Sequence, residues 1–324
     1  MEDIPKLPWS QKLSYGVGHV LNDITASLWF TYLIVYLQFV LCFNTSLAGL
    51  LLLVGQVSDA LSTILVGYES DTSVEGYIYR KYGRRKTLHL LGTLCVILSF
   101  PFIFTKCPGC ENASEWAIFV FLAPLVVIFQ FGWACTQVSH LALIPTITSN
   151  DSERELLNIL RYSFDVISDT MAYIAVLVVF ETMSNGNIDD LSITRDDSLK
   201  FTVISFLLVG VGAGFAVIFH IGVKENQPHH NKPTTKTPRK LGSLKWTYWL
   251  KNKHFYQVAT LYTVARMFQN FVGVFIPLYL QESLGLTQDF LAKIPLVMNL
   301  SGFLASLLLR LMLKFCGKKV SFYN

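Results

Sequence analysis

Eight apolar stretches, each close to twenty residues long, constrain the fold of this chain more than any other feature. A bilayer core about 30 Å thick is crossed by roughly 20 helical residues at a rise of about 1.5 Å each. No stretch alternates with the period of two that barrel strands show, so each must satisfy its backbone as a helix. We therefore predict an all-α integral membrane protein with spans at 14–39, 47–68, 88–104, 116–143, 159–180, 200–223, 255–280 and 290–313.

Composition supports lipid as the solvent for most of the chain. Hydrophobic residues make up 52% of the sequence and charged residues 15%, whereas soluble domains carry about a quarter charged residues. The basic residues lie between apolar segments and do not form a nucleic-acid footprint. The expected partners are the lipid bilayer and a small-molecule substrate, with no nucleic acid, and the oligomeric state is left open.

The distribution of Lys and Arg predicts the orientation. Of the 26 basic residues, twenty lie on the side of the N-terminus and four on the other side, and Arg266 and Arg310 fall inside spans. Cytosolic loops carry the excess of positive charge, so the N-terminus is expected in the cytosol. The sequon at Asn112 then lies on the opposite side and is the predicted glycosylation site.

The order of the spans suggests two related halves. A polar connector, residues 224–253, separates a six-helix bundle (1–223) from two further helices (254–324). Tyr-Leu-Gln occurs at positions 36–38 in the first span and 279–281 in the seventh, and thirteen residues before each tyrosine stand Asp23 and Arg266. Parallel repeats of this kind are the plan of major facilitator transporters. We therefore expect the major facilitator fold, with eight of its twelve helices present.

Ionisable residues at bilayer depth are costly and usually face a cavity or a partner. Asp23 and Asp59 lie deep in the first and second spans, and we predict that they carry the coupling cation or proton. The predicted substrate cavity uses polar residues of spans four, five and seven: Arg161, Gln137, His140, Arg266 and Asn270. The alternative is a set of structural ion pairs and hydrogen bonds between neighbouring helices, and for His140 this alternative is favoured.

Three motifs resemble the melibiose carrier and its relatives, the glycoside-pentoside-hexuronide:cation symporters of the major facilitator superfamily. They are Lys-Leu-Ser-Tyr-Gly-Val-Gly at 12–18 followed by Asn22-Asp23, Asp59-Ala60, and the junction at 143–161. The resemblance implies symport by alternating access. The loop that holds Asp71 and the cluster Gly83, Arg84, Arg85 and Lys86 looks like a stretched form of the superfamily's gating loop.

The chain departs from the melibiose pattern at two cation-site positions. Thr63 and Gln137 stand where those symporters carry acids. Sodium coupling is therefore doubtful, and a proton on Asp23 or Asp59 is the expected coupling ion. No cofactor and no bound metal are expected.

A longer resemblance, in segments at 50–57, 99–104, 128–134 and 294–298, is to an animal branch of this group. It implies import of cysteine into lysosomes or melanosomes. The alternatives are a symporter of sugar or another organic solute at the plasma membrane, and a truncated isoform that does not transport. No motif for an enzyme is found.

Cys107 and Cys110 flank Pro-Gly in the loop after the third span. A pair at this spacing can form a tight disulfide or undergo thiol exchange, and one pair alone is too few ligands for tetrahedral zinc. We expect a small structural disulfide.

Overall fold

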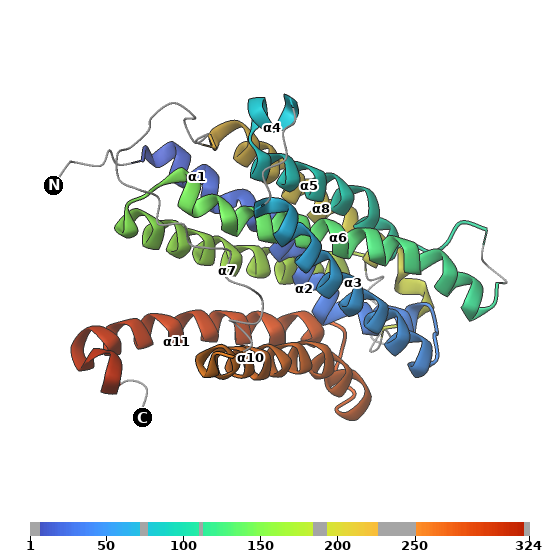
Figure 1. Cartoon of the computed structure of the whole chain (residues 1–324). Coiled ribbons are helices and arrows are strands. Elements are labelled where there is room, and N and C mark those ends of the chain that lie inside the picture. Colours follow the sequence, from blue (N-terminus) through green and yellow to red (C-terminus); the bar gives the residue numbers. More distant parts are fainter. Residues whose placement is uncertain (1–6, 72–76, 110–112, 184–192, 226–250, 321–324) are drawn as a thin grey trace, which may run out of the picture.

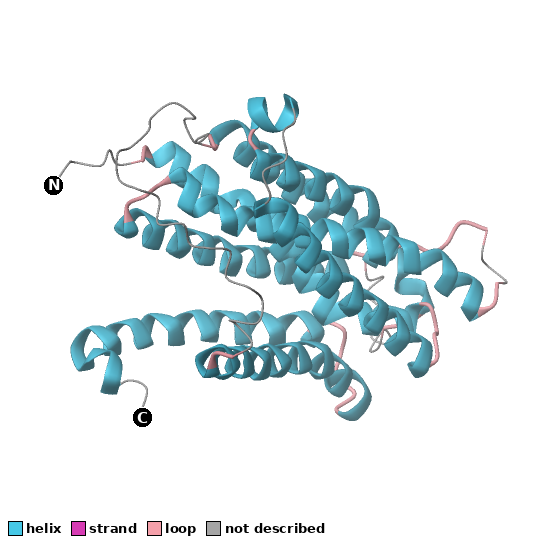
Figure 2. Cartoon of the chain, in the orientation of Figure 1, coloured by secondary structure: helices cyan, strands magenta, loops and turns pink. Residues whose placement is uncertain are grey.

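A computed structural model describes residues 7–71, 77–109, 113–183, 193–225 and 251–320, without the side chains of 80, 306, 307 and 309–320. Every regular element within these ranges is a helix (Figures 1 and 2). The first span is composite: α1 (Trp9–Gly16), η1 (Val17–His19), α2 (Val20–Val35) and η2 (Tyr36–Val40). The other elements are α3 (Thr45–Asp71), α4 (Tyr77–Tyr82), α5 (Arg84–Ile103), α6 (Glu115–Ile147), α7 (Asp151–Thr182), η3 (Arg195–Asp197), α8 (Ser198–Gly222), α10 (Lys253–Leu278), η4 (Tyr279–Ser283) and α11 (Phe290–Val320).

The predicted spans one to six correspond to six helical segments that are long and apolar enough to cross a membrane. Spans seven and eight correspond to α10 and α11, which are 26 and 31 residues long. The helices extend beyond the predicted spans because hydropathy detects only the part of a helix that lies in the hydrocarbon core of the membrane. α7 begins at Asp151, eight residues before the predicted start, where the Asn150 side chain accepts a hydrogen bond from the Ser152 N–H.

The first span is the centre of the bundle. α2 packs against α7 and α8 within the N-terminal six spans, and against α10 from the second half, while α11 packs against α7. Aromatic side chains of α2 and its neighbours fill the core, among them Trp29, Tyr36, Phe100 and Phe129. α5 and α6 approach closely at Gly92, where an added Cβ would lie 2.5 Å from the Gly132 carbonyl oxygen. Small residues allow such backbone contact between membrane helices.

The structure repeats the same geometry at the two Tyr-Leu-Gln motifs. A five-residue π-helix starts at Tyr36 and at Tyr279, and each is closed by a bond to the tyrosine carbonyl, from Leu41 at 3.0 Å and from Leu284 at 3.2 Å. The next residue adopts a positive φ in both halves: 56° at Cys42 and 58° at Gly285. The repeat that aligns Asp23 with Arg266 in the sequence is therefore also present in the local backbone structure.

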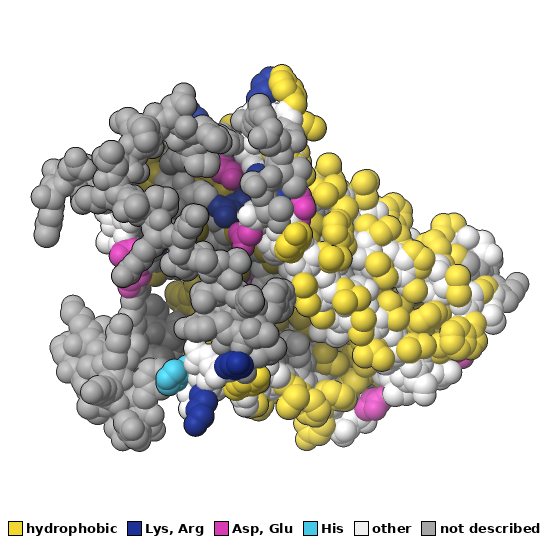
Figure 3. Space-filling model, in the orientation of Figure 1, with side chains coloured by type: hydrophobic (Ala, Val, Ile, Leu, Met, Phe, Trp, Pro, Cys, Tyr) yellow, Lys and Arg dark blue, Asp and Glu magenta, His cyan; other side chains and the backbone are white. Residues whose placement is uncertain are grey.

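The outside of the bundle suits a bilayer. Large hydrophobic side chains of α3, α5 and α8, such as Leu65, Leu98 and Ile221, are more than 60% exposed. On the face in Figure 3 they form a broad apolar surface, and most of the visible charged side chains lie toward one end. Lipid, not water, is the medium that such a surface fits.

Candidate transport site

Asp23 lies at the centre of a buried cluster between the first and fifth spans. The His19 ring one turn earlier approaches it, with Nδ1 2.5 Å from Asp23 Oδ1, and both side chains are buried. Asp165 of α7 lies within hydrogen-bonding reach of Asp23, and the Arg161 guanidinium acts electrostatically on both carboxyls. Two carboxyl groups hydrogen-bond to each other only when one carries a proton. The cluster therefore has the chemistry of a proton-binding site.

The cluster continues as a polar ladder along α2 and α7. Residues four apart lie on one face of a helix, and three successive rungs join the two helices. The first is Asp23 with Asp165. In the second, the Ser27 hydroxyl donates to an Asp169 carboxylate oxygen, and in the third the Thr31 and Tyr173 hydroxyls are 3.5 Å apart. The ladder gives polar groups a continuous route through an otherwise apolar interface.

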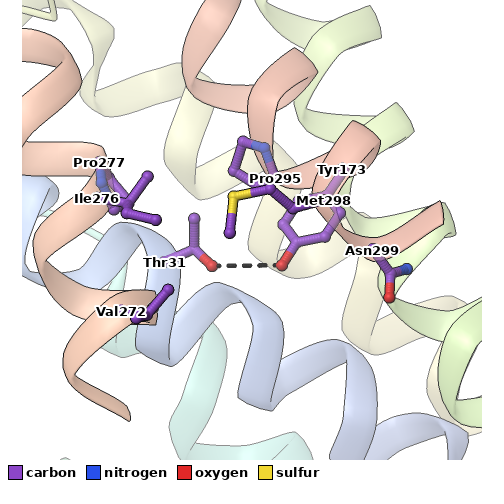
Figure 4. Close-up of a pocket in the computed structure, with 9 residues that line it drawn as sticks. Thr31, Tyr173, Val272, Ile276, Pro277, Pro295, Met298 and Asn299 are labelled. Carbon is purple, nitrogen blue, oxygen red and sulfur yellow. Dashed lines mark hydrogen bonds between the residues drawn. The ribbon is translucent and has the colours of Figure 1, made fainter. Parts of the chain in front are cut away.

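A pocket of about 170 Å³ lies at the end of this ladder (Figure 4). The hydroxyls of Thr31 and Tyr173 point toward each other at its wall, and Asn299 lies beside them. Its volume is well below the roughly 300–1,000 Å³ of pockets for drug-sized ligands, so it suits a small solute. The lining comes from α2, α7, α10 and α11: Thr31, Tyr173, Val272, Gly273, Ile276, Pro277, Pro295, Met298 and Asn299.

Two prolines change the backbone chemistry of the pocket wall. Proline has no N–H, so the carbonyl four residues before it loses its helical hydrogen bond. Pro295 frees the carbonyl of Leu291, and the Tyr32 hydroxyl donates to that oxygen at 3.0 Å. Pro277 frees the carbonyl of Gly273 in the same way, and Gly273 lines the pocket. A freed carbonyl at membrane depth is an acceptor for a solute with N–H or O–H donors.

Asp59, the other predicted coupling residue, lies outside this cluster. It is half-buried on α3, where the Thr63 hydroxyl donates to Asp59 Oδ1 at 3.4 Å. Its electrostatic partner is Arg266 of α10, whose guanidinium attracts the carboxylate and whose Nε donates to the Tyr262 hydroxyl at 3.2 Å. The two predicted carboxylates thus occupy different environments.

The remaining predicted cavity residues are placed as follows. Gln137 on α6 and Asn270 on α10 are half-buried. His140 is fully buried and forms a reciprocal pair with Tyr15: His140 Nε2 donates to the Tyr15 carbonyl at 2.9 Å, and the Tyr15 hydroxyl donates to the His140 carbonyl at 3.0 Å. This matches the structural alternative for His140, a hydrogen-bond partner between α1 and α6.

The predicted gating loop forms a cluster of contacts on the predicted cytosolic side. Arg85 lies 3.7 Å from an Asp71 carboxylate oxygen, and Arg84 lies 3.2 Å from Glu69. Lys86 Nζ donates to the carbonyls of His220, at 3.0 Å, and Val223, at 2.7 Å, at the end of α8. The basic cluster therefore holds the ends of α3 and α8 to the start of α5.

Gly83 is required by this arrangement. Its φ is 98°, and an added Cβ would lie 2.2 Å from Glu225 Oε2. The Glu225 carboxylate accepts hydrogen bonds near the start of α5, from the Arg85 N–H through Oε1 and from the Lys86 N–H through Oε2. We predict that Gly83→Ala lowers stability by about 1–2 kcal/mol through its left-handed backbone, and further by displacing Glu225. Thermal unfolding in detergent measures this, with Gly67→Ala, where an added Cβ meets nothing within 4 Å, as the matched control. Equal melting temperatures for the two variants would contradict the prediction.

Contacts on the opposite side join the two halves. Gln288 Nε2 donates to Asp197 Oδ2 at 3.3 Å, and Asp197 also pairs with Lys200 at 2.7 Å. Leu280 and Leu291 are buried there. In the middle of the bundle, Asn299 Nδ2 donates to the Val166 carbonyl at 3.2 Å. These contacts hold α10 and α11 to the N-terminal six spans.

Two predictions fall in the loop after α5. Cys107 is disulfide-bonded, and Cys110 and Asn112 lie outside the described residues. Asn44 begins a second sequon, Asn-Thr-Ser at 44–46, on the same predicted side. Its side chain caps α3, since its Oδ1 accepts a hydrogen bond from the Leu47 N–H at 2.8 Å.

Comparison with known proteins agrees with the fold. The family described as MFS/sugar transport protein matches residues 14–324. Major facilitator superfamily domain-containing protein 12 is 44% identical in human, over 97% of this chain and 68% of that protein. The mouse protein of the same name is 41% identical, over 98% and 69%. The putative sulfoquinovose importer of Escherichia coli strain K12 is 24% identical, over 74% and 47%.

The chain belongs to the MFS/sugar transport family of the major facilitator superfamily. It is an integral multi-pass membrane transporter and not an enzyme. The predicted fold class is therefore confirmed.

Proposed function

We propose that this protein is a proton-coupled secondary transporter that moves a small polar solute by alternating access. The observation that carries the proposal is the polar ladder, in which buried Asp23 and half-buried Asp165 are followed by Ser27 with Asp169 and then by the pocket at Tyr173. Proton binding and solute binding would share one set of side chains between α2 and α7. Binding of one would therefore change the affinity for the other.

Cysteine is the proposed solute. The resemblance to the animal branch supports it, and so does the small pocket with its hydroxyls and the freed Gly273 carbonyl. That oxygen is a suitable acceptor for an ammonium group, and the Thr31 and Tyr173 hydroxyl pair offers a donor for a carboxylate. The proposed location is the membrane of lysosomes or melanosomes, with the N-terminus in the cytosol.

A proton is the proposed coupling ion because the Asp59 site has a hydroxyl, Thr63, and a cation, Arg266, as its neighbours. Hard cations such as sodium bind best where several oxygen ligands converge. The positive charge of Arg266 beside the Asp59 carboxylate opposes the binding of a sodium ion there.

Uptake of radiolabelled cysteine into proteoliposomes that contain the native-length protein tests the function. We expect accumulation that collapses with a protonophore and does not change when sodium is replaced by choline. Labelled melibiose and serine in parallel vesicles serve as comparison solutes. Cysteine levels equal to those in protein-free vesicles would overturn the proposed substrate, and dependence on sodium would overturn the proposed coupling ion.

A further inference from the structure

His19 stands out among the buried groups that the proposed transport cycle does not yet use. It is 3% exposed and lies in η1, where the first span changes from α1 to α2. Its Nδ1 contacts Asp23, and its Nε2 is a buried nitrogen without a hydrogen-bond partner among the described residues. Asp23 Oδ2 is also buried and receives no hydrogen bond from an N–H or hydroxyl group among the described residues. Buried polar atoms are normally paired, and an exception calls for a functional or structural reason.

The charge of the surrounding site gives the first part of that reason. Three carboxyl groups, Asp23, Asp165 and Asp169, act on one another, and the Arg161 guanidinium acts on the first two. Uncompensated charge in a membrane interior is expensive, so such a cluster holds protons. His19 offers the cluster a second kind of proton acceptor.

The connectivity gives the second part. Asp23 is in contact with the His19 ring on one side and within hydrogen-bonding reach of Asp165 on the other. His19 and Asp23 are four residues apart, so they share one helical face across the η1–α2 junction. A proton can therefore be passed in either direction along His19, Asp23 and Asp165 without any of the three helices separating.

The other histidines near His19 form hydrogen bonds with partners outside the carboxyl cluster. His140 of α6 has its ring centre 5.5 Å away and donates from Nε2 to the Tyr15 carbonyl. His89 of α5 contacts the Gly18 carbonyl through Nε2 and His220 of α8 through Nδ1. Because a carbonyl only accepts, Nε2 of His140 and of His89 carries the hydrogen. His19, by contrast, faces a carboxyl, which can give or accept a proton.

We propose that His19 is a proton-coupling residue that forms, with Asp23 and Asp165, one proton-transferring triad. This proposal rests on the proposed function as a proton-coupled transporter. In the transfer step, the proton on Asp23 Oδ1 passes to His19 Nδ1 while Asp23 Oδ2 accepts the proton of Asp165. The number of protons and the net charge of the triad are unchanged, and the step leaves a positive charge on His19, on the α1 side, and a negative charge on Asp165, on the α7 side. Asp165 is then left as a carboxylate beside Arg161.

Replacement of His19 by glutamine separates proton transfer from structure. The amide keeps a hydrogen bond to Asp23 but cannot carry a proton. We expect H19Q in proteoliposomes to lower proton-driven accumulation of labelled cysteine by about a hundredfold, the low end for a positioned proton-transfer group. Counterflow of cysteine without a gradient should stay within a factor of about two, since exchange needs no net proton movement. H254Q, which alters an exposed histidine at the start of α10, is the matched control with both activities retained.

Two outcomes in this assay contradict the triad. Wild-type accumulation by H19Q would show that His19 does not transfer the proton. Equal loss of accumulation and counterflow would show that His19 only supports the structure.

A second measurement does not depend on the solute. Ring ¹⁵N spectra of histidine-labelled protein in nanodiscs, with the His19 signals identified from H19Q, should change in both shift and pH response when Asp23 is replaced by asparagine. Unchanged His19 signals in D23N would overturn the triad. If the wild-type protein moves no cysteine while these signals do change, the proposed substrate fails and the triad stands.

Discussion

Asp23→Asn is expected to lower proton-driven solute accumulation by about a hundredfold or more while the protein still inserts into the membrane. Asparagine has nearly the same size and can still face His19 and Asp165. It cannot bind or release a proton, so the carboxyl pair at the head of the ladder is lost. The measurement is labelled-cysteine uptake into proteoliposomes under an imposed pH gradient, with the amount of inserted protein determined by immunoblot.

The matched control is Asp196→Asn, because Asp196 is an exposed aspartate of η3. It removes the same charge on the predicted non-cytosolic surface and should leave uptake unchanged. Counterflow by D23N should persist, as it does not require the coupling proton. Accumulation by D23N at the wild-type level would show that Asp23 is a structural residue and that the coupling site lies elsewhere, with Asp59 as the next candidate.

The number of spans and their pairing across the two halves could be predicted because these signals are local. Each span is a run of apolar residues, and the repeat at positions 36–38 and 279–281 needs only the sequence to be seen. The structure shows the same repeat in the backbone, as two π-helical turns and a positive φ at both Cys42 and Gly285. Helix ends could not be predicted as well. The helices continue beyond hydrocarbon, as α7 does from Asp151.

The site was predicted in part. The depth of Asp23 in its span made it a predicted coupling residue. The four-residue spacing of Arg161, Asp165 and Asp169 is enough to place them on one face of a helix. Which face of α2 meets them depends on how the helices pack, so the pairing of Ser27 with Asp169 could not be predicted from the sequence.

Two other site features had a usable signal in the sequence. His19 lies four residues before Asp23, on the same face, and that spacing could have identified it. Tyr173 continues the stripe of Asp165 and Asp169 by one more turn. Neither spacing shows that these side chains are buried beside a carboxyl or a pocket, because burial is set by the neighbouring helices.

The ion pair between Lys12 and Glu153 leads to the second prediction with a large expected effect. Lys12 of α1 lies 2.8 Å from Glu153 Oε2 of α7, and the two side chains are 5% and 9% exposed. Removing one partner of such a pair leaves a buried charge without compensation, which costs about 3–5 kcal/mol. We therefore expect Lys12→Met to lower the melting temperature by roughly 6 °C or more, at about 2 °C per kcal/mol for a chain of this size.

The double variant Lys12→Met, Glu153→Leu distinguishes the ion pair from simple loss of packing. With both charges replaced by apolar side chains of similar volume, most of the lost stability should return, because no charge remains to be solvated. The matched control is Asp151→Asn, which breaks the neighbouring pair with Arg154, 95% and 37% exposed, and should not change the melting temperature. If the double variant is no more stable than Lys12→Met alone, the two side chains act independently. α1 and α7 are then joined at this end by apolar packing around Leu157 and Tyr15, and the ion pair contributes nothing to it.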